Sequence, residues 1–219
     1  MTTPTTIDTE TELSAVNTIL GAIGQSPVTT LGTITTNVTN TATEVANTFE
    51  NPEIALIYQI LKESNIDVQN EGWSFNTEDH IKKTPDANGY ILFDTNALRM
   101  DLHESQDKFF DVIRRNGRLY DKVNHTDVWT DDQYVNIVWL FDFDDIPSIF
   151  KRLITYKAAG RAATQMVNNQ QLVQLIQLQE QSARAACMEY ECNQGDHNFL
   201  GFPHESSFNT YKPYIGLAR

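Results

Sequence analysis

The sequence predicts an α+β protein, in which a discontinuous helical bundle carries an inserted small antiparallel β domain and an extended C-terminal arm. Helical spacing of apolar residues occurs toward both ends of the chain, whereas residues 73–144 carry short extended patterns. Aromatic residues continue after the last helical pattern, where no local element could cover them. Because no single helix can bury its apolar face alone, we expect the N- and C-terminal helices to close one bundle.

These patterns divide the chain into three parts. Residues 1–72 and 145–192 form the predicted bundle, residues 73–144 the β domain, and residues 193–219 the arm. A chain of 219 residues can bury roughly 70% of the surface that its unfolded form exposes, which is enough for one large core or two small ones.

The first helix is predicted to begin at Glu12 and to end at Gly24, which adopts the left-handed conformation at low cost. Pro27 prevents the helix from resuming. Its expected buried stripe is Leu13, Val16, Leu20 and Ile23. Residues 26–48 are rich in threonine and asparagine and nearly uncharged, which indicates a long surface loop, with or without short extended pieces.

A second helix is predicted from Asn51-Pro52-Glu53 to near Gly72, because asparagine caps helices and proline fits their first turn. Its expected buried face comprises Ile54, Ile57, Tyr58, Leu61 and Val68. The alternation at 73–76 predicts a strand. Further strands are expected at 90–93, 109–114, 118–120 and 134–141. Asn116-Gly117 is a strong hairpin signal, and the apolar run at 134–141 favours a central position in the sheet.

The remaining two helices follow the β domain. Asp145 is expected to cap the first of them, with Pro147 in its first turn. Its predicted buried side is Ile149, Leu153, Tyr156, Gly160 and Ala163. The last helix should run from about Asn169 to Glu191, with a buried side of Leu172, Leu175, Ile176, Ala183, Ala186 and Tyr190. Opposite lies a stripe of glutamines, Gln170, Gln174, Gln177 and Gln181.

The net charge of −13 argues against ordinary nucleic-acid binding, which needs a basic face. Acidic walls would, however, let DNA slide through a pore without sticking. The alternative is that the charge only keeps the protein soluble. No apolar run is long enough to cross a membrane and no secretion signal precedes the first helix, so we expect the protein to stay where it is made. Cys187 and Cys192 are expected to be small buried residues rather than a disulfide.

No motif for a catalytic nucleophile, a nucleotide-binding loop or a zinc site occurs, and we predict no catalytic residue, no cofactor and no metal. The carboxylates of Asp142, Asp144 and Asp145 are better explained by helix capping than by a hard cation, which needs about six oxygen ligands. The histidines are assigned ordinary surface or packing roles: His80, His103, His125, His197 and His204. A glycosidase needs only two carboxylates, so the sequence leaves that alternative open.

Three groups of residues are candidates for interfaces. Arg114, Arg115 and Arg118 surround the predicted hairpin turn and could hold carboxylates of an adjoining subunit or phosphate, although a solvated turn is equally plausible. The glutamine stripe suits a face that meets a copy of itself, or is a plain exposed face. The third group is aromatic and either docks on another chain or wraps its own bundle: Phe199, Phe202, Phe208, Tyr211 and Tyr214.

Four segments occur in a distinctive order: ELSAVNTILGAIGQSPV at 12–28, EGWSFNTE at 71–78, FDFDDIP at 141–147 with the small-residue helix after it, and ARAACMEYE at 183–191. In this order they resemble the tail tubular protein A family, the head-to-tail adaptors of short-tailed bacteriophages. The resemblance implies a structural virion protein, assembled in the host cytoplasm, that forms a ring of twelve copies. The ring would lie between the portal protein and a tail nozzle of the tail tubular protein B type.

Genomic DNA would pass through this ring without specific binding, and no membrane anchor is expected. Two other functions are weighed against it. One is a virion-associated peptidoglycan hydrolase that acts during entry, for which the only support is the abundance of carboxylates and the implied location in the tail. The other is an intracellular helical binding module unrelated to virions. Incubation with peptidoglycan tests the hydrolase through released sugar ends, and the appearance or absence of rings in electron micrographs separates the binding module from the structural function.

Overall fold

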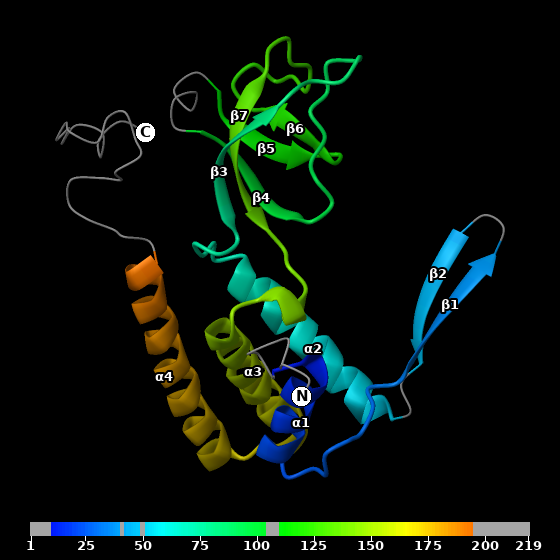
Figure 1. Ribbon diagram of the computed structural model, residues 1–219, viewed down its shortest axis with the longest axis vertical. Helices are drawn as coiled ribbons and strands as arrows, with labels where there is room; N and C mark the ends of the chain where they lie inside the picture. The colour runs from blue at the N-terminus through cyan, green and yellow to red at the C-terminus, as the bar shows by residue number, and fades with distance from the viewer. Residues whose placement is uncertain (1–9, 40–41, 49–50, 104–109, 195–219) are drawn as a thin grey trace, which may run out of the picture. The chain divides into compact units, whose positions relative to one another are not determined.

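A computed structural model describes residues 10–39, 42–48, 51–103 and 110–194 of the chain, and it shows an α+β fold (Figure 1). The chain forms two compact units. Unit 1 comprises Met1–Val68 and Asp142–Met188, and unit 2 comprises Gln69–Phe141 and Glu189–Arg219. Each unit is described separately below. None of the described helices is both long and apolar enough to cross a membrane.

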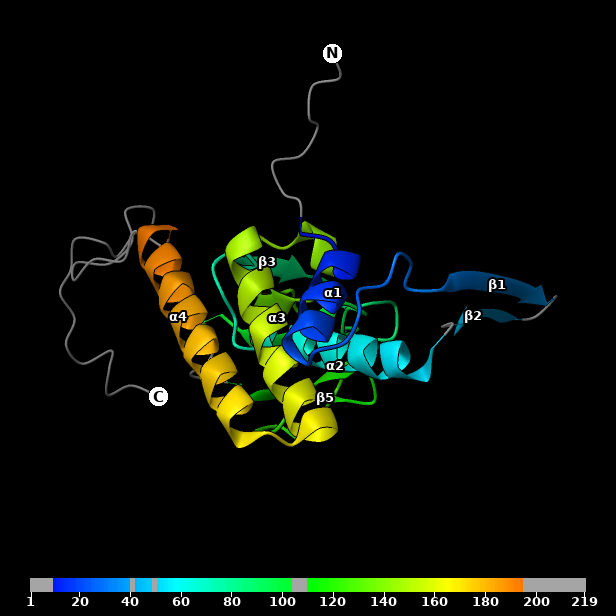
Figure 2. The same cartoon turned by 90° about the horizontal axis from the view of Figure 1, so that it is seen from below.

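Unit 1 is mainly helical. Its elements are α1 (Glu12–Ala22), β1 (Thr33–Thr39), β2 (Ala42–Thr48), α2 (Pro52–Gln69), a 3-10 turn η1 (Phe143–Asp145), α3 (Ser148–Ala162), a π-helical turn η2 (Ala163–Val167) and α4 (Gln170–Gln194). The last residue of α2 and the last turn and a half of α4 fall in unit 2. Figure 2 shows α3 in the middle, with α1 on one side and α4 on the other.

Helix α1 has the ends that the sequence predicts. Thr11 caps it, because its hydroxyl accepts a hydrogen bond from the Ser14 amide at 3.3 Å. Gly24 has a φ of 81°, and the Gln25 amide donates to the Leu20 carbonyl at 2.8 Å, which closes the helix end. Val16 and Leu20 are buried as predicted, and the structure adds the buried residues Ala15 and Ile19.

The loop predicted for residues 26–48 is wrong over most of its length. Strands β1 and β2 pair antiparallel in unbroken register, from Thr33 opposite Thr48 to Thr39 opposite Ala42. The threonine content that suggested a loop also favours strands, because a β-branched residue fits the pleated backbone. Amino-acid composition alone therefore does not distinguish a loop from a pair of strands in this segment.

Helix α2 begins as predicted, with the Asn51 side chain accepting from the Glu53 amide at 3.0 Å. The predicted strand at 73–76 is wrong, because these residues form a turn. Asn76 closes it: its side-chain oxygen accepts from the Trp73 amide at 2.8 Å, and its own amide donates to the Trp73 carbonyl at 3.1 Å. Strand β3 starts only at Thr77.

Unit 2 contains two small antiparallel sheets. One has the order β3-β7-β4, made of β3 (Thr77–Lys83), β4 (Ala97–Leu102) and β7 (Gln133–Trp139). The central position predicted for the apolar run is therefore confirmed. The other sheet pairs β5 (Val112–Arg115) with β6 (Arg118–Asp121). Its Asn116-Gly117 turn has φ values of 53° and 72°, which confirms the predicted hairpin.

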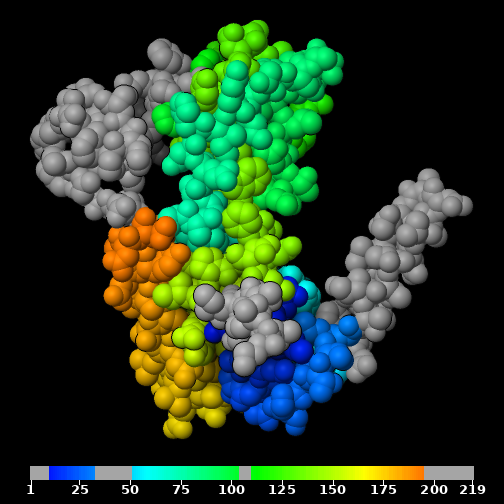
Figure 3. Space-filling view, viewed as in Figure 1, coloured from blue at the N-terminus to red at the C-terminus, as the bar shows by residue number. Residues whose placement is uncertain are grey.

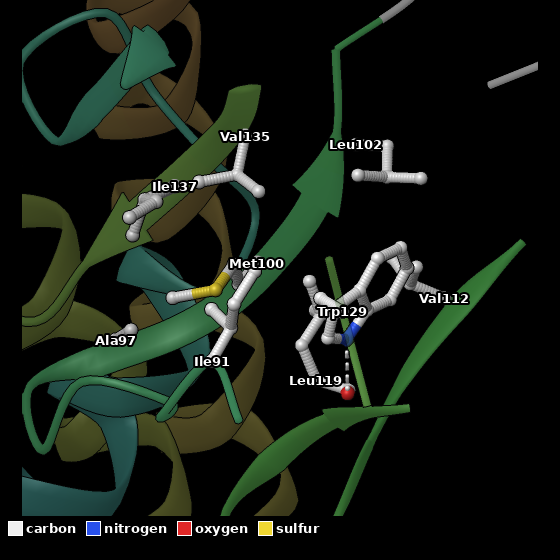
Figure 4. Close-up of a cluster of buried hydrophobic side chains, with 9 residues drawn as sticks. All are labelled: Ile91, Ala97, Met100, Leu102, Val112, Leu119, Trp129, Val135 and Ile137. Carbon is white, nitrogen blue, oxygen red and sulfur yellow. Dashed lines mark hydrogen bonds between the residues drawn. The ribbon is translucent and has the colours of Figure 1, made fainter. Parts of the chain in front are cut away.

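Apolar side chains from both sheets form the core of unit 2 (Figure 4). Trp129 belongs to this core, and its indole N–H donates to the Leu119 carbonyl at 3.0 Å, so its one polar group is satisfied. The predicted strand at 90–93 is reduced to two isolated bridges, Tyr90 with Val128 and Leu92 with Arg118.

The two C-terminal helices differ from the prediction in detail. Asp145 lies in η1 rather than at a cap, and α3 starts after Pro147 without a side-chain cap. Asn169 caps α4, accepting from the Gln171 amide at 3.0 Å. Of the predicted buried side of α3, only Leu153 and Ala163 are fully buried. Phe150 and Ile154 take the central positions, because α1 and α4 flank α3 on two sides.

Two predictions of burial on α4 are wrong. Leu175 is 62% exposed, and Cys192 is exposed, whereas Cys187 is buried as expected. The side of α4 that packs against α3 is narrower than the predicted buried side, and its fully buried residues are Ile176 and Cys187. The Cys187 thiol lies 3.5 Å from the Ile149 carbonyl of α3, which fixes the orientation of this side.

Candidate interaction surfaces

The arginines of the β5–β6 hairpin each stack on an aromatic ring. The guanidinium of Arg114 lies 4.7 Å from the ring centre of Phe93, that of Arg115 lies 4.0 Å from Tyr120, and that of Arg118 lies 3.7 Å from Tyr90. Such stacking restricts the guanidinium groups while leaving their N–H donors available to a partner.

The three arginines differ in their electrostatic partners. Arg118 also pairs with Asp127 at 3.1 Å, and this hydrogen-bonded carboxylate raises the pKa of the guanidinium. Among the described residues, no carboxylate lies within ion-pair distance of Arg114 or Arg115. The hairpin therefore presents two positive charges that the described part of its own chain does not neutralise.

Exposed apolar side chains surround these arginines. The register of the hairpin puts Ile113 opposite Tyr120 and Arg115 opposite Arg118, and Leu92 bridges to Arg118. Leu92 and Ile113 are both strongly exposed. The arginines are recognisable in the sequence, whereas Tyr90 and Leu92 are not recognisable as their neighbours, because they come from a segment more than twenty residues away.

The glutamine stripe of α4 is exposed along its whole length: Gln170, Gln174, Gln177 and Gln181. Leu178 is 61% exposed and lies within the stripe, four residues after Gln174 and three before Gln181. The sequence analysis did not include Leu178, although this spacing could have found it. Figure 3 shows α4, coloured yellow to orange, open to solvent in this view.

A shallow groove runs between α3 and the start of α4. Its volume is about 350 Å³, and it is lined by Lys157, Gly160, Arg161, Thr164, Gln165, Val173, Gln177 and Glu180. A Cβ at Gly160 would lie 3.8 Å from Ile176, an ordinary van der Waals distance, so the two helices are close here without requiring glycine. The groove is open and mostly polar in its residues, which is unlike the enclosed apolar pocket that a small molecule needs.

Neither the acidic residues nor the histidines gather into a metal site within the described ranges. Asp142, Asp144 and Asp145 are exposed around η1. The His80 ring stacks on Tyr134 at 4.4 Å and meets the His103 ring edge-on at 4.7 Å. The aromatic residues of the predicted arm lie outside the described residues: Phe199, Phe202, Phe208, Tyr211 and Tyr214.

Within the part of the chain that the structure describes, the features that stand out are exposed interaction surfaces. A comparison with protein-family models matches residues 13–197 to the tail tubular protein family. The chain belongs to the tail tubular protein family. It is accordingly a structural protein of the bacteriophage virion tail, as the sequence resemblance implies. No curated protein matches the chain.

Proposed function

We propose that this family member is a head-to-tail adaptor, which forms a ring between the portal protein and the tail nozzle. Its copies pack side by side through α4, and the acidic interior of the ring lets genomic DNA pass without binding. The proposal combines the family membership with the exposed outer side of α4.

The contrast between α3 and α4 supports this proposal most directly. Helix α3 has 15 residues and buries eight of them, whereas α4 has 25 residues and buries only Ile176 and Cys187. Most of the stability of a helix in a protein comes from packing of its apolar face. A helix about 37 Å long with so little burial has an outer side available for another chain.

The chemistry of this outer side fits a contact between copies. Leu175 and Leu178 supply apolar area, and the glutamines supply hydrogen-bonding groups that carry no charge. A chain with a net charge of −13 would gain little from placing carboxylates there, because every copy repels the next. Uncharged amides avoid this repulsion.

Particle size tests the proposal. The purified full chain is measured by mass photometry and negative-stain electron microscopy, alone and with the portal protein. Twelve 24.9 kDa chains would form a ring of roughly 300 kDa. Monomers under both conditions would contradict the proposal. DNA should not be retarded by the rings at physiological salt.

A single charge on α4 tests which side makes the contact. Leu178→Glu should prevent or strongly weaken assembly, because it buries an unpaired carboxylate at the contact. Gln179→Glu is the matched control: it adds the same charge at an exposed position 100° further around the helix. Equal effects of the two variants would exclude this side of α4.

A further inference from the structure

The outer face of the β5–β6 hairpin, here named the Arg–Tyr face, is a second interaction surface. It consists of Tyr90, Leu92, Ile113, Arg115, Arg118 and Tyr120, whereas Arg114, opposite the buried Leu119, lies on the other face of the hairpin. We propose that the Arg–Tyr face binds the exposed carboxylates around η1 on a second copy of this chain. This inference rests on the proposed ring, since it names a contact that joins neighbouring copies.

The composition of the face is that of a protein-binding surface. Tyrosine and arginine are enriched in binding hot spots, whereas lysine and glutamate are depleted there. Leu92 is 61% exposed, and Ile113 lies on the same face of the hairpin. Exposed aliphatic groups beside stacked arginines favour a protein partner over a phosphate backbone, which would meet only the positive charges.

Charge complementarity indicates that the partner is a second copy. The chain has a net charge of −13, so copies that approach one another repel unless local opposite charges meet. Of the two arginines on this face, Arg115 pairs with no carboxylate among the described residues. The contact would use its charge against the excess negative charge of the neighbour.

The described carboxylates that best complement the face are Asp142, Asp144 and Asp145. All three are exposed within four residues, and none takes part in an ion pair within the described ranges. Phe141, which precedes them, is also partly exposed and adds an aromatic ring next to the charges. Arginine forms bidentate hydrogen bonds with carboxylates, so a rigid hairpin can recognise such a group specifically.

The symmetry of this contact agrees with a ring. The Arg–Tyr face belongs to unit 2 and the carboxylates belong to unit 1, so the contact joins two different surfaces of the chain. A contact between unlike surfaces is heterologous, and it generates closed rings or filaments rather than isolated dimers.

Charge reversal and charge exchange test the inference. Arg115→Glu/Arg118→Glu, which reverses both arginines of the face, should raise the Kd of assembly of the full chain roughly 30-fold or more. Asp144→Arg/Asp145→Arg should do the same. The chain that carries all four substitutions should assemble again, because the charges are exchanged. The matched control Arg99→Glu reverses an exposed arginine of β4 outside the face and should leave the Kd within about twofold.

Each outcome has a distinct meaning. If wild-type rings form and the arginine variant has an unchanged Kd, the Arg–Tyr face does not hold a second copy, although the ring proposal stands. If the four-substitution chain assembles no better than either double variant, the carboxylates around η1 are not the counterpart and the inference is wrong. If arginine reversal abolishes binding to portal or nozzle but not self-assembly, the partner is a different protein. If the wild type never assembles, both proposals fail.

Discussion

In each unit, buried polar side chains join backbone segments that are distant in the sequence, but the chemical groups that do so differ between the units. In unit 1 a buried ammonium group connects distant backbone segments, whereas in unit 2 two buried amide side chains do so. The Lys151 side chain is 2% exposed, and the Gln69 and Asn76 side chains are fully buried. The comparison shows how the hydrogen-bonding capacity of a side chain decides which backbone groups it can join.

In unit 1 the Lys151 ammonium donates to the Glu10 carbonyl at 3.1 Å and to the Asp144 carbonyl at 2.9 Å. Glu10 precedes α1 and Asp144 lies in the middle of η1, so the contact joins the two chain segments of the unit. An ammonium group has three donors and no acceptor, which suits backbone carbonyls that no helix satisfies.

In unit 2 the amides act as a substitute for strand pairing. The Gln69 side chain donates to the Phe141 carbonyl at 2.9 Å and accepts from the Phe141 amide at 2.8 Å. The Asn76 side chain donates to the carbonyls of Gln69 and Trp139, both at 2.9 Å. An amide both donates and accepts, so it can match the N–H and C=O groups of an extended chain, which lysine cannot.

The largest effect should come from Asn76→Leu, which removes three buried hydrogen bonds and leaves the partner groups unsatisfied. We expect a loss of about 4 kcal/mol in the unfolding free energy of unit 2. All three tryptophans, Trp73, Trp129 and Trp139, lie in unit 2, so their fluorescence reports its unfolding. The control is the exposed neighbour substitution Asn70→Leu; if it costs as much, the buried amide is not the cause.

Lys151→Met should cost about 3 kcal/mol, because two carbonyls lose their donor while the apolar stem is retained. The loss should appear mainly in circular dichroism at 222 nm, since unit 1 holds nearly all of the helix. Lys157→Met on the same helix is the matched control. A larger shift in tryptophan fluorescence than in helical signal would contradict the separation of the two units.

Replacing a glycine by alanine should change the free energy of unfolding in opposite directions in the two units. Gly117→Ala places a Cβ at a φ of 72° and should destabilise unit 2 by about 1 kcal/mol. Gly21→Ala, inside α1 with nothing within 4 Å of the new Cβ, should stabilise unit 1 by roughly 0.5–1 kcal/mol. Thermal unfolding of both variants, monitored by tryptophan fluorescence and by circular dichroism at 222 nm, tests this prediction. If both substitutions stabilise or both destabilise, backbone conformation does not control the effect at these positions.

The smallest expected effect is a pH dependence confined to unit 2. Burial disfavours the charged Asp121 carboxylate, but hydrogen bonds from the Val123 amide, the Asn124 side chain and the Asp111 amide outweigh it and lower its pKa. A lowered pKa stabilises the fold above the unfolded value of about 3.9, and this contribution is lost as the pH falls through the folded pKa.

Asp121→Asn should flatten the acid side of the tryptophan-monitored stability curve. Asp86→Asn is a suitable control, since its exposed carboxylate accepts only local turn hydrogen bonds. An unchanged slope in Asp121→Asn would mean that other carboxylates control the acid unfolding of unit 2.

Local signals in the sequence predicted those parts of the fold whose causes are local. The glycine after α1, the Asn116-Gly117 turn and the apolar run of β7 each act within a few residues, and all three are confirmed. The candidate arginines were also visible in the sequence. Their aromatic partners Tyr90 and Phe93 were not, because strand pairing brings them from more than twenty residues away.

By itself, then, the sequence determined the fold class, the positions of the helices, the β5–β6 hairpin, strand β7 and the likeness to tail tubular proteins. Only the tertiary structure decided which side of α4 is buried and that Asn76 closes a turn instead of entering a strand. The physical reason is that periodicity fixes which residues share a face, whereas the neighbour that packs there decides how much of that face is covered. For α4 that neighbour is α3, and it covers Ile176 while leaving Leu175 and Leu178 exposed.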